Sequence, residues 1–235
     1  MKEIKVVAVI SSANYNGSGA EFARAALNAA EKQGATVTEI FLQKKRLNYC
    51  TGCLKCITNG KCSIGDDFEE IKSTLYDSNG IILCSPTFCG DMNAAMKNLL
   101  DRLGMYEFFT SMLGGKYVIG ISTASGLGPA KKTAKKLANV VSNGLFKRSV
   151  ISGTLGVSIR QNKTSEKSDG LLKASELGEK LTRDIKENKN YYSQNILSRI
   201  VLHNFVRPSI RKYIIAKKQD ETKAVYDNLY QRGLL

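Results

Sequence analysis

The sequence predicts an α/β fold built on a doubly wound, five-stranded parallel sheet. Short apolar runs of strand length alternate with segments of helical periodicity from residue 4 to residue 154. The first run, residues 4–10, is apolar enough to be buried on both faces, as strands of parallel sheets are. Loops rich in Ser, Gly and Pro separate the segments. Such alternation builds a parallel sheet with right-handed crossovers and helices on both faces.

The predicted elements follow in order along the chain. We expect strands at residues 4–10, 36–42, 80–84, 117–121 and 150–154, and helices at residues 20–32, 66–76, 91–103 and 129–141. Asp66 and Asp67 suit a helix start because carboxylates accept backbone hydrogen bonds there and oppose the helix dipole. Pro129 opens the last helix. Ligands of such sheets bind beyond the carboxyl ends of the strands, so the loops after the first, third and fourth strands form the candidate site.

The first of these loops, residues 11–20, offers hydroxyls, glycines and free backbone amides at a helix start. This combination suits a phosphate monoester, which the positive end of a helix dipole attracts. No Lys or Arg lies in the segment, so neutral donors would bind the phosphate. A plain connecting loop is the alternative, because a Ser- and Gly-rich turn does not by itself define a binding site. The sequence has neither a Gly-x-Gly-x-x-Gly fingerprint nor a Gly-Lys-Ser/Thr ending here, which argues against a dinucleotide-type or P-loop site.

The second and third loops complete the candidate pocket. In residues 85–93, a proline-fixed turn is followed by an aromatic residue and a glycine. Backbone amides in such a turn can lie along a flat ring, with Phe88 shielding one side. Residues 122–128 add small side chains and hydroxyls at the next strand end.

Four cysteines, Cys50, Cys53, Cys56 and Cys62, lie within thirteen residues. Thiolates at this spacing can converge on one iron–sulfur cluster. Two alternatives remain open: a zinc site, although structural zinc more often uses two separated Cys-x-x-Cys knuckles, and a cysteine-rich loop without metal. Cys84 is expected to pack inside a strand, and Cys89 is too isolated to be assigned as a redox thiol.

Charge and composition exclude several classes of protein. Residues 1–125 hold 13 Lys and Arg against 12 Asp and Glu, whereas residues 126–235 hold 22 against 9. Part of this excess of positive charge lies in residues 188–219, which contain seven Lys and Arg and no Asp or Glu. These residues form a basic amphipathic tail, suited to an anionic surface or an oligomer contact. No nucleic-acid motif accompanies it, and no apolar run predicts a transmembrane segment. His203 is the only histidine, which excludes a Ser/His/Asp hydrolase on the sheet.

The motifs together resemble a known family. The Ser-rich first loop, the cysteine loop before Asp66 and Asp67, residues 85–90, and Lys97 followed by Asp101 and Arg102 are similar to NADPH-dependent FMN reductase-like flavoproteins. Within that family the chain is most similar to the iron–sulfur flavoproteins, over about residues 4–155. The resemblance implies a flavodoxin-like sheet of order 2-1-3-4-5, non-covalent FMN, a 4Fe-4S cluster on the four cysteines, and a homodimer or homotetramer.

The resemblance also implies roles for individual residues. The FMN phosphate would contact Ser12, Asn14, Ser18, Gly19 and Ala20. The isoalloxazine ring would lie along Pro86, Thr87, Phe88, Cys89 and Gly90, with Ser122, Thr123, Ala124, Ser125 and Gly126 at its other edge. The chain departs from the family at Ala13-Asn14, where relatives often carry Pro-Arg, and at Ser18-Gly19, where they carry Asn-Thr. Losing the arginine removes a charge-assisted contact to the phosphate.

These observations predict a cytoplasmic FMN-dependent oxidoreductase, without an obligatory protein acid or base. Electrons would pass from NADH, NADPH or a ferredoxin to a small-molecule acceptor, and the flavin would carry the chemistry. The alternatives are an iron-free reductase of flavins, quinones or nitro compounds, and a zinc-stabilised binding protein with a docking tail. We expect a flavin-binding domain over residues 1–188, with its cysteine-rich loop at 49–65, and a helical extension over 189–235 that serves as an oligomer arm or a surface anchor.

Overall fold

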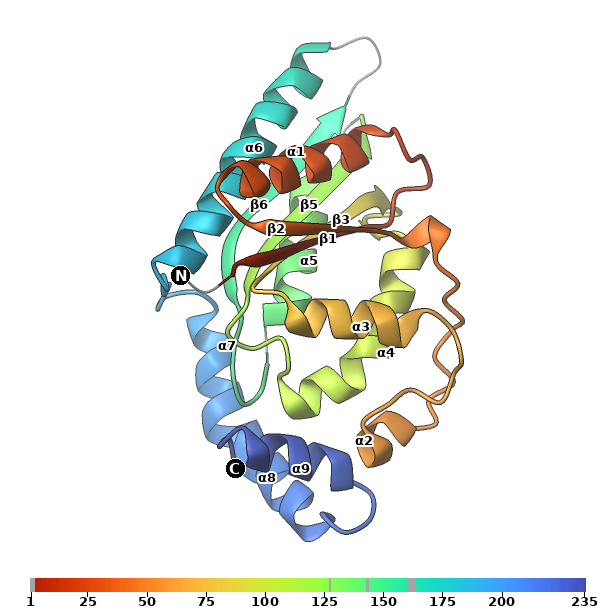
Figure 1. Ribbon diagram of the computed structural model, residues 1–235, viewed down its shortest axis with the longest axis vertical. Coiled ribbons are helices and arrows are strands. Elements are labelled where there is room, and N and C mark those ends of the chain that lie inside the picture. Colours follow the sequence, from red (N-terminus) through yellow and green to blue (C-terminus); the bar gives the residue numbers. More distant parts are fainter. Residues whose placement is uncertain (1–2, 127, 143, 160–163) are drawn as a thin grey trace.

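A single parallel sheet forms the centre of the molecule (Figure 1). The computed structural model describes residues 3–126, 128–142, 144–159 and 164–235. The main strands lie in the order β2-β1-β3-β5-β6, which confirms the predicted order once a two-residue strand, β4, is set aside. Their bounds are β1 Lys5–Ile10, β2 Thr36–Phe41, β3 Gly80–Phe88, β4 Asp91–Met92, β5 Tyr117–Ser125 and β6 Val150–Ile159. All main-strand pairs are parallel, and β4 pairs antiparallel with β3.

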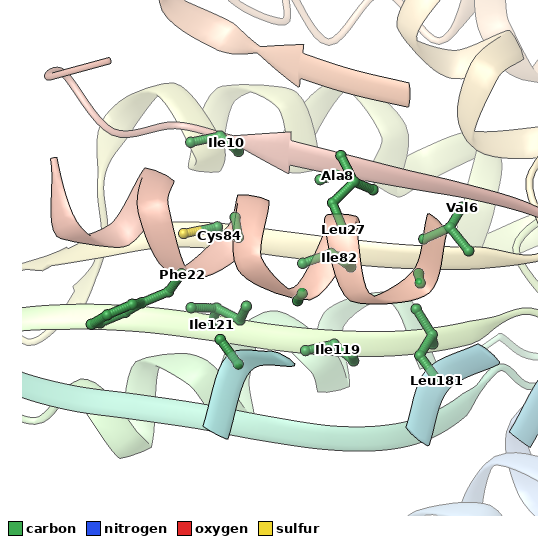
Figure 2. Packing of buried hydrophobic residues seen from close by; sticks show 14 of the residues in the cluster. Val6, Ala8, Ile10, Phe22, Leu27, Ile82, Cys84, Ile119, Ile121 and Leu181 are labelled. Carbon is green, nitrogen blue, oxygen red and sulfur yellow. The ribbon is translucent and has the colours of Figure 1, made fainter. Parts of the chain in front are cut away.

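Helices cover both faces of the sheet because the strands are apolar on both sides. On β1, Val6, Ala8 and Ile10 belong to one core cluster, and Val7 and Val9 belong to another. Figure 2 shows the first cluster, under α1 (Ser18–Lys32) and α6 (Thr164–Lys186). The second cluster lies under α3 (Phe68–Asp77), α4 (Ala94–Thr110) and α5 (Ala130–Ser142).

The C-terminal residues fold back onto the same chain. They form α7 (Ile196–Val201), a π-helical turn η2 (Leu202–Val206), α8 (Arg207–Ala216) and α9 (Lys223–Gln231). Ile214, Val225 and Leu229 are fully buried in a third core cluster, with residues of α4 and Ile57. Ile57 belongs to α2 (Lys55–Asn59), which lies inside the cysteine loop beyond the 3-10 turn η1 (Leu42–Lys44). The extension therefore packs against the cysteine loop (Figure 1).

Several predicted element bounds are wrong. β3 continues to Phe88 and β5 to Ser125, where loops were expected, and β6 continues to Ile159, beyond its predicted end at residue 154. The strands continue because the parallel pairing extends through Pro86 and Thr123 between β3 and β5, and through Ser125 and Ile159 between β5 and β6. Ser122 Oγ also donates to the Ser85 carbonyl at 2.7 Å. The helix expected at residues 91–103 is α4. It begins at Ala94 and not at Asp91, because Asp91 and Met92 pair with β3. The sequence did not single out α2 or α6.

The contact between α1 and α6 depends on glycine. A Cβ at Gly170 would lie 2.5 Å from the ring of Phe22, and one at Gly178 would collide with the Ala26 carbonyl. Glycine lets two helix backbones approach closely, and added atoms in a packed core force the neighbours to shift. The two glycines thus determine how closely α6 packs on α1.

We predict that Gly178→Ala lowers the free energy of unfolding by about 1–3 kcal/mol, because the helices must separate. Gly104→Ala in α4 is the matched control, since nothing lies within 4 Å of its Cβ position. Relief of the glycine penalty there should be neutral or stabilising, by up to about 1 kcal/mol. Urea unfolding of both variants measures the difference, and equal effects would contradict this account.

Glu107 of α4 is a buried carboxylate near the C-terminal helices. The Leu113 N–H donates to both of its oxygens at 3.1 Å, and Arg232 and Lys116 are nearby charges. Burial nevertheless raises the pKa of Glu107 from 4.5 to about 8. The unfolded chain releases this proton first as the pH rises, so the corresponding stabilisation is complete below about pH 4.5 and is lost by about pH 8.

We predict that Glu107→Gln gains stability relative to the parent protein between about pH 5 and pH 8, by up to about 1.4 kcal/mol per pH unit. The amide stays neutral and keeps an oxygen for the Leu113 N–H. Urea unfolding at several pH values checks this, with the exposed Glu31→Gln as control. A pH-independent difference between Glu107→Gln and the parent would contradict it.

Candidate functional site

Asn93 joins the first two loops at the carboxyl ends of β1 and β3. Its side chain caps α4 by accepting from Met96 N–H, and its Nδ2 donates to the Ser11 carbonyl at 2.5 Å. Its backbone N–H donates to Ser85 Oγ at 3.0 Å. Sequence analysis did not predict this role, although an Asn before an apolar helix is a preferred N-cap and was the available signal. One buried amide thus holds the two predicted loops together.

The first loop ends at an open helix terminus. Ser12 Oγ donates to the Asn14 carbonyl at 2.6 Å, and the Asn14 side chain accepts from Asn16 N–H, so both predicted residues shape the turn. Gly17 is the N-cap of α1 and supplies no side-chain cap. The predicted residues Ser18, Gly19 and Ala20 form the first helical turn, not the loop. Backbone N–H groups at such a terminus suit an anion.

Arg24 braces the outside of the first loop. Its guanidinium bonds Glu39 with two contacts of 2.7 and 2.9 Å and donates to the Tyr15 carbonyl at 2.6 Å. It also lies 3.9 Å from the centre of the Tyr15 ring. The pairing with Glu39 raises the pKa of Arg24. A cation is therefore held beside the loop, although the loop sequence contains none.

The segment predicted to bind the ring is a β-hairpin and not a proline-fixed loop. Pro86, Thr87 and Phe88 are the last residues of β3, and β4 pairs back onto them. Cys89 and Gly90 form the turn with positive φ angles of 49° and 81°. Two successive positive φ angles define a type I′ turn, whose twist matches a hairpin. Phe88 is 57% exposed, which leaves its ring free to contact a ligand.

The third segment lies beside the first two. Thr87 Oγ1 and Ser122 Oγ are 2.9 Å apart, and Pro86 pairs with Thr123 in the β3–β5 register. A Cβ at Gly19 would lie 3.3 Å from Thr123 Oγ1. Ser122, Thr123, Ala124 and Ser125 end β5, and Gly126 follows with a φ of 59°. The structure brings the three predicted segments to one sheet edge.

The cysteine loop is fastened to α3 and α4 by a buried ion pair. Arg102 Nη1 lies 2.5 Å from Asp66 Oδ2, and both side chains have no exposed surface. Arg102 also donates to the Asn48 carbonyl at 3.3 Å and to Cys62 Sγ at 3.2 Å. Asp66 accepts from the N–H groups of Asn48 and Phe68. Burial raises the pKa of Asp66, but these donors outweigh it and hold the pKa below its usual value.

The predicted cap of α3 is therefore correct for Asp66 only. Asp67 occupies the N-cap position but makes no side-chain cap bond. Its carboxylate instead accepts from Arg46 N–H at 2.7 Å. The sequence did not predict that the carboxylates of Asp66 and Asp67 also hold the backbone where the cysteine loop begins. Asn98 Nδ2 holds the same stretch by donating to the Leu47 carbonyl at 3.1 Å.

The four thiols differ in environment. Cys50 and Cys53 are exposed, and Cys56 and Cys62 are half-buried. A hydrogen bond to Ser63 lowers the pKa of the Cys53 thiol to about 7. Burial raises the pKa of Cys56, and the charges of the other three thiolates raise it further. Among the described residues, no three His, Cys, Asp or Glu side chains gather closely enough to hold a metal ion, so metal binding by this loop stays a prediction.

The other two cysteines have separate positions. Cys84 is fully buried in β3 and donates to the Gly19 carbonyl at 3.1 Å, as expected for a core residue. Burial raises the pKa of its thiol to about 12. Cys89 is exposed at the tip of the hairpin. Within the described ranges, no helix is long and apolar enough to cross a membrane.

Solved structures with the same fold include two that are named as reductases. A flavone reductase superposes with a TM-score of 0.59 at 16% identity, over 80% of this chain and 66% of its own. An azoreductase of Bacillus anthracis gives 0.57 at 16% identity, over 75% of this chain and 99% of its own. This likeness establishes the class of fold, which is flavodoxin-like.

The chain belongs to the NADPH-dependent FMN reductase family, whose sequence model matches residues 4–161. An iron–sulfur flavoprotein of Archaeoglobus fulgidus is 32% identical over 59% of this chain and 62% of its own. One of Methanocaldococcus jannaschii is 36% identical over 52% and 65%, and one of Clostridioides difficile is 27% identical over 80% of both. The chain spans under two thirds of the length of the first two relatives.

We predict that Arg102→Met lowers the free energy of unfolding by about 3–5 kcal/mol, because it leaves the buried Asp66 carboxylate unpaired. Adding Asp66→Asn should restore part of the loss, since the double variant buries no charge. Lys97→Met is the matched control on the same helix, where the ion pair with Asp101 is about half-exposed and is worth under about 1 kcal/mol. Additive losses for Arg102→Met and Asp66→Asn would contradict a coupled pair.

Proposed function

We propose that this protein binds FMN at the sheet edge, holds a 4Fe-4S cluster on Cys50, Cys53, Cys56 and Cys62, and passes electrons to a small-molecule acceptor. A reduced nicotinamide or a ferredoxin would supply the electrons. The observation that carries the proposal is that one helix serves both sites. Asn93 at the start of α4 joins the flavin loops, and Asn98 and Arg102 hold the cysteine loop.

The residues at the sheet edge fit FMN. The uncapped first turn of α1 offers N–H groups for the phosphate, and the hairpin from Pro86 to Gly90 offers an exposed edge and the Phe88 ring for the isoalloxazine. Gly19 lies so close to Thr123 that a side chain would crowd the space between α1 and β5. When bound, FMN accepts a hydride and releases electrons singly or in pairs. The protein binds and orients the ring, and requires no acid or base of its own.

The cysteine loop fits a cluster by its donor set. Four thiols in thirteen residues match the sulfur ligands of a 4Fe-4S centre. Arg102, which donates to Cys62 Sγ, would hold that sulfur in place and favour its thiolate form. The names of the relatives from Archaeoglobus fulgidus and Clostridioides difficile support the same assignment.

An iron-free NAD(P)H-dependent reductase is the second candidate. It is favoured by the separation of the thiols, which form no metal-binding group among the described residues. The zinc-stabilised, non-catalytic alternative has no such support, because the family is one of oxidoreductases. We further propose that the protein is a homodimer or homotetramer, which light scattering after size-exclusion chromatography measures.

We predict that protein purified without oxygen contains flavin with about four irons and four sulfides per chain. Cys53→Ser should lose most of the iron and keep the flavin, because it removes a ligand outside the flavin site. Cys89→Ser is the matched control for iron content. It should keep the iron, because Cys89 is also exposed but lies in the hairpin, outside the cysteine loop. For the parent protein and for each of the two variants, the visible spectrum and assays of flavin, iron and sulfide are measured on one sample.

Flavin without iron in the parent protein would overturn the cluster and leave the iron-free reductase. Absence of flavin would overturn FMN binding at the sheet edge. Anaerobic titration of the flavin with NADH, NADPH and reduced ferredoxin then identifies the electron donor by which one bleaches the flavin absorbance.

A further inference from the structure

The segment formed by α7 and η2, residues 196–206, is apolar on two sides. On its inner side, Leu202 and Val206, followed by Ile210 of α8, pack against the third core cluster. On its outer side, Leu197 and Phe205 are 77% and 70% exposed. Ile196, Ile200 and Val201 are each about half-exposed beside them. The outer apolar side chains belong to none of the three core clusters of the described residues.

The body of the protein leaves this segment loosely covered. None of the residues of α7 or η2 is buried. Leu197 and Val201, although exposed, also border a cavity of about 630 Å³ between the segment and helices α4 and α5, which Leu103, Phe108 and Val140 line on the other side. A second cavity of about 440 Å³ lies on the side of Ile200, Arg199 and Arg207. Exposed apolar side chains gathered in this way mark an interaction surface.

The charge of the surrounding chain identifies the kind of partner. Residues 188–219 contain seven Lys and Arg and no Asp or Glu. Arg211 and Lys212 are exposed and form no ion pair with any described residue. Two copies of this surface facing each other across a two-fold axis would bring both sets of cations together, which disfavours a second copy as the occupant. A partner with dense negative charge and an apolar interior satisfies both features.

We propose that residues 196–218 dock this protein on the surface of an anionic phospholipid bilayer. Leu197, Ile200 and Phe205 insert into the boundary between headgroups and acyl chains, and the neighbouring Arg and Lys side chains contact lipid phosphates. The segment lies on the membrane and does not cross it. Docking requires neither cofactor, so it is independent of the proposed electron transfer.

The test is vesicle flotation of the full-length, flavin-containing protein. Vesicles of phosphatidylcholine with about one third phosphatidylglycerol should carry the protein at low salt, and pure phosphatidylcholine vesicles should not. Salt at about 0.5 M should weaken binding, because it screens the cations. Leu197→Ser with Phe205→Ser should reduce the bound fraction about tenfold, since two inserted side chains are lost.

Leu172→Ser is the matched control, because Leu172 is 63% exposed on α6, outside the docking segment. It should bind vesicles as the parent protein does. Circular dichroism and bound flavin confirm that each variant is folded. Equal flotation of the parent and the Leu197→Ser, Phe205→Ser variant overturns the proposal, as does failure of the parent to float. Conversion of an oligomeric parent to a monomer by the same pair of substitutions also overturns it, and assigns the surface to a second copy.

Discussion

The buried ion pair between Arg102 and Asp66 is the interaction on which the candidate site depends. Neither side chain has exposed surface, and an unpaired charge in such a place is strongly destabilising. The pair is therefore formed whenever the chain is folded. Because Arg102 also contacts the Asn48 carbonyl and Cys62 Sγ, the same guanidinium fixes both ends of the cysteine loop. Arg102 Nε has no hydrogen-bond partner among the described residues, so the guanidinium makes these contacts through its two Nη atoms.

Helix α4 extends this constraint to the sheet edge. Asn93 at its N-terminus binds Ser11 and Ser85, and Arg102 lies nine residues further along. At the rise of an α-helix, that separation is about 14 Å along the axis. The two candidate cofactor sites therefore have a fixed spacing within one rigid element. Helix α4 is therefore part of the candidate site, although none of its residues was predicted to bind a ligand.

The C-terminal helices belong to the same arrangement on its outer side. Val225 and Leu229 of α9 are fully buried near Ile57, within the cysteine loop. Thr58 Oγ1 also donates to the Glu221 carbonyl at 3.2 Å. The extension expected as an arm thus covers one side of the cysteine loop through its last helix. The preceding segment, α7 and η2, keeps apolar side chains such as Leu197 and Phe205 exposed.

The sequence alone determined the alternation of strands and helices, the helix-covered faces and the family motifs, because these depend on local periodicity and on residue types at short spacing. The strand order followed from the family resemblance that those motifs carry. Only the tertiary structure decided how far β3 and β5 extend, since that depends on the pairing of Ser85 with Ser122 and of Pro86 with Thr123, which are far apart in the sequence. It also decided that Asn93 reaches Ser11 and that Arg102 pairs with Asp66. Those partners are 82 and 36 positions apart, and no local pattern reports such contacts.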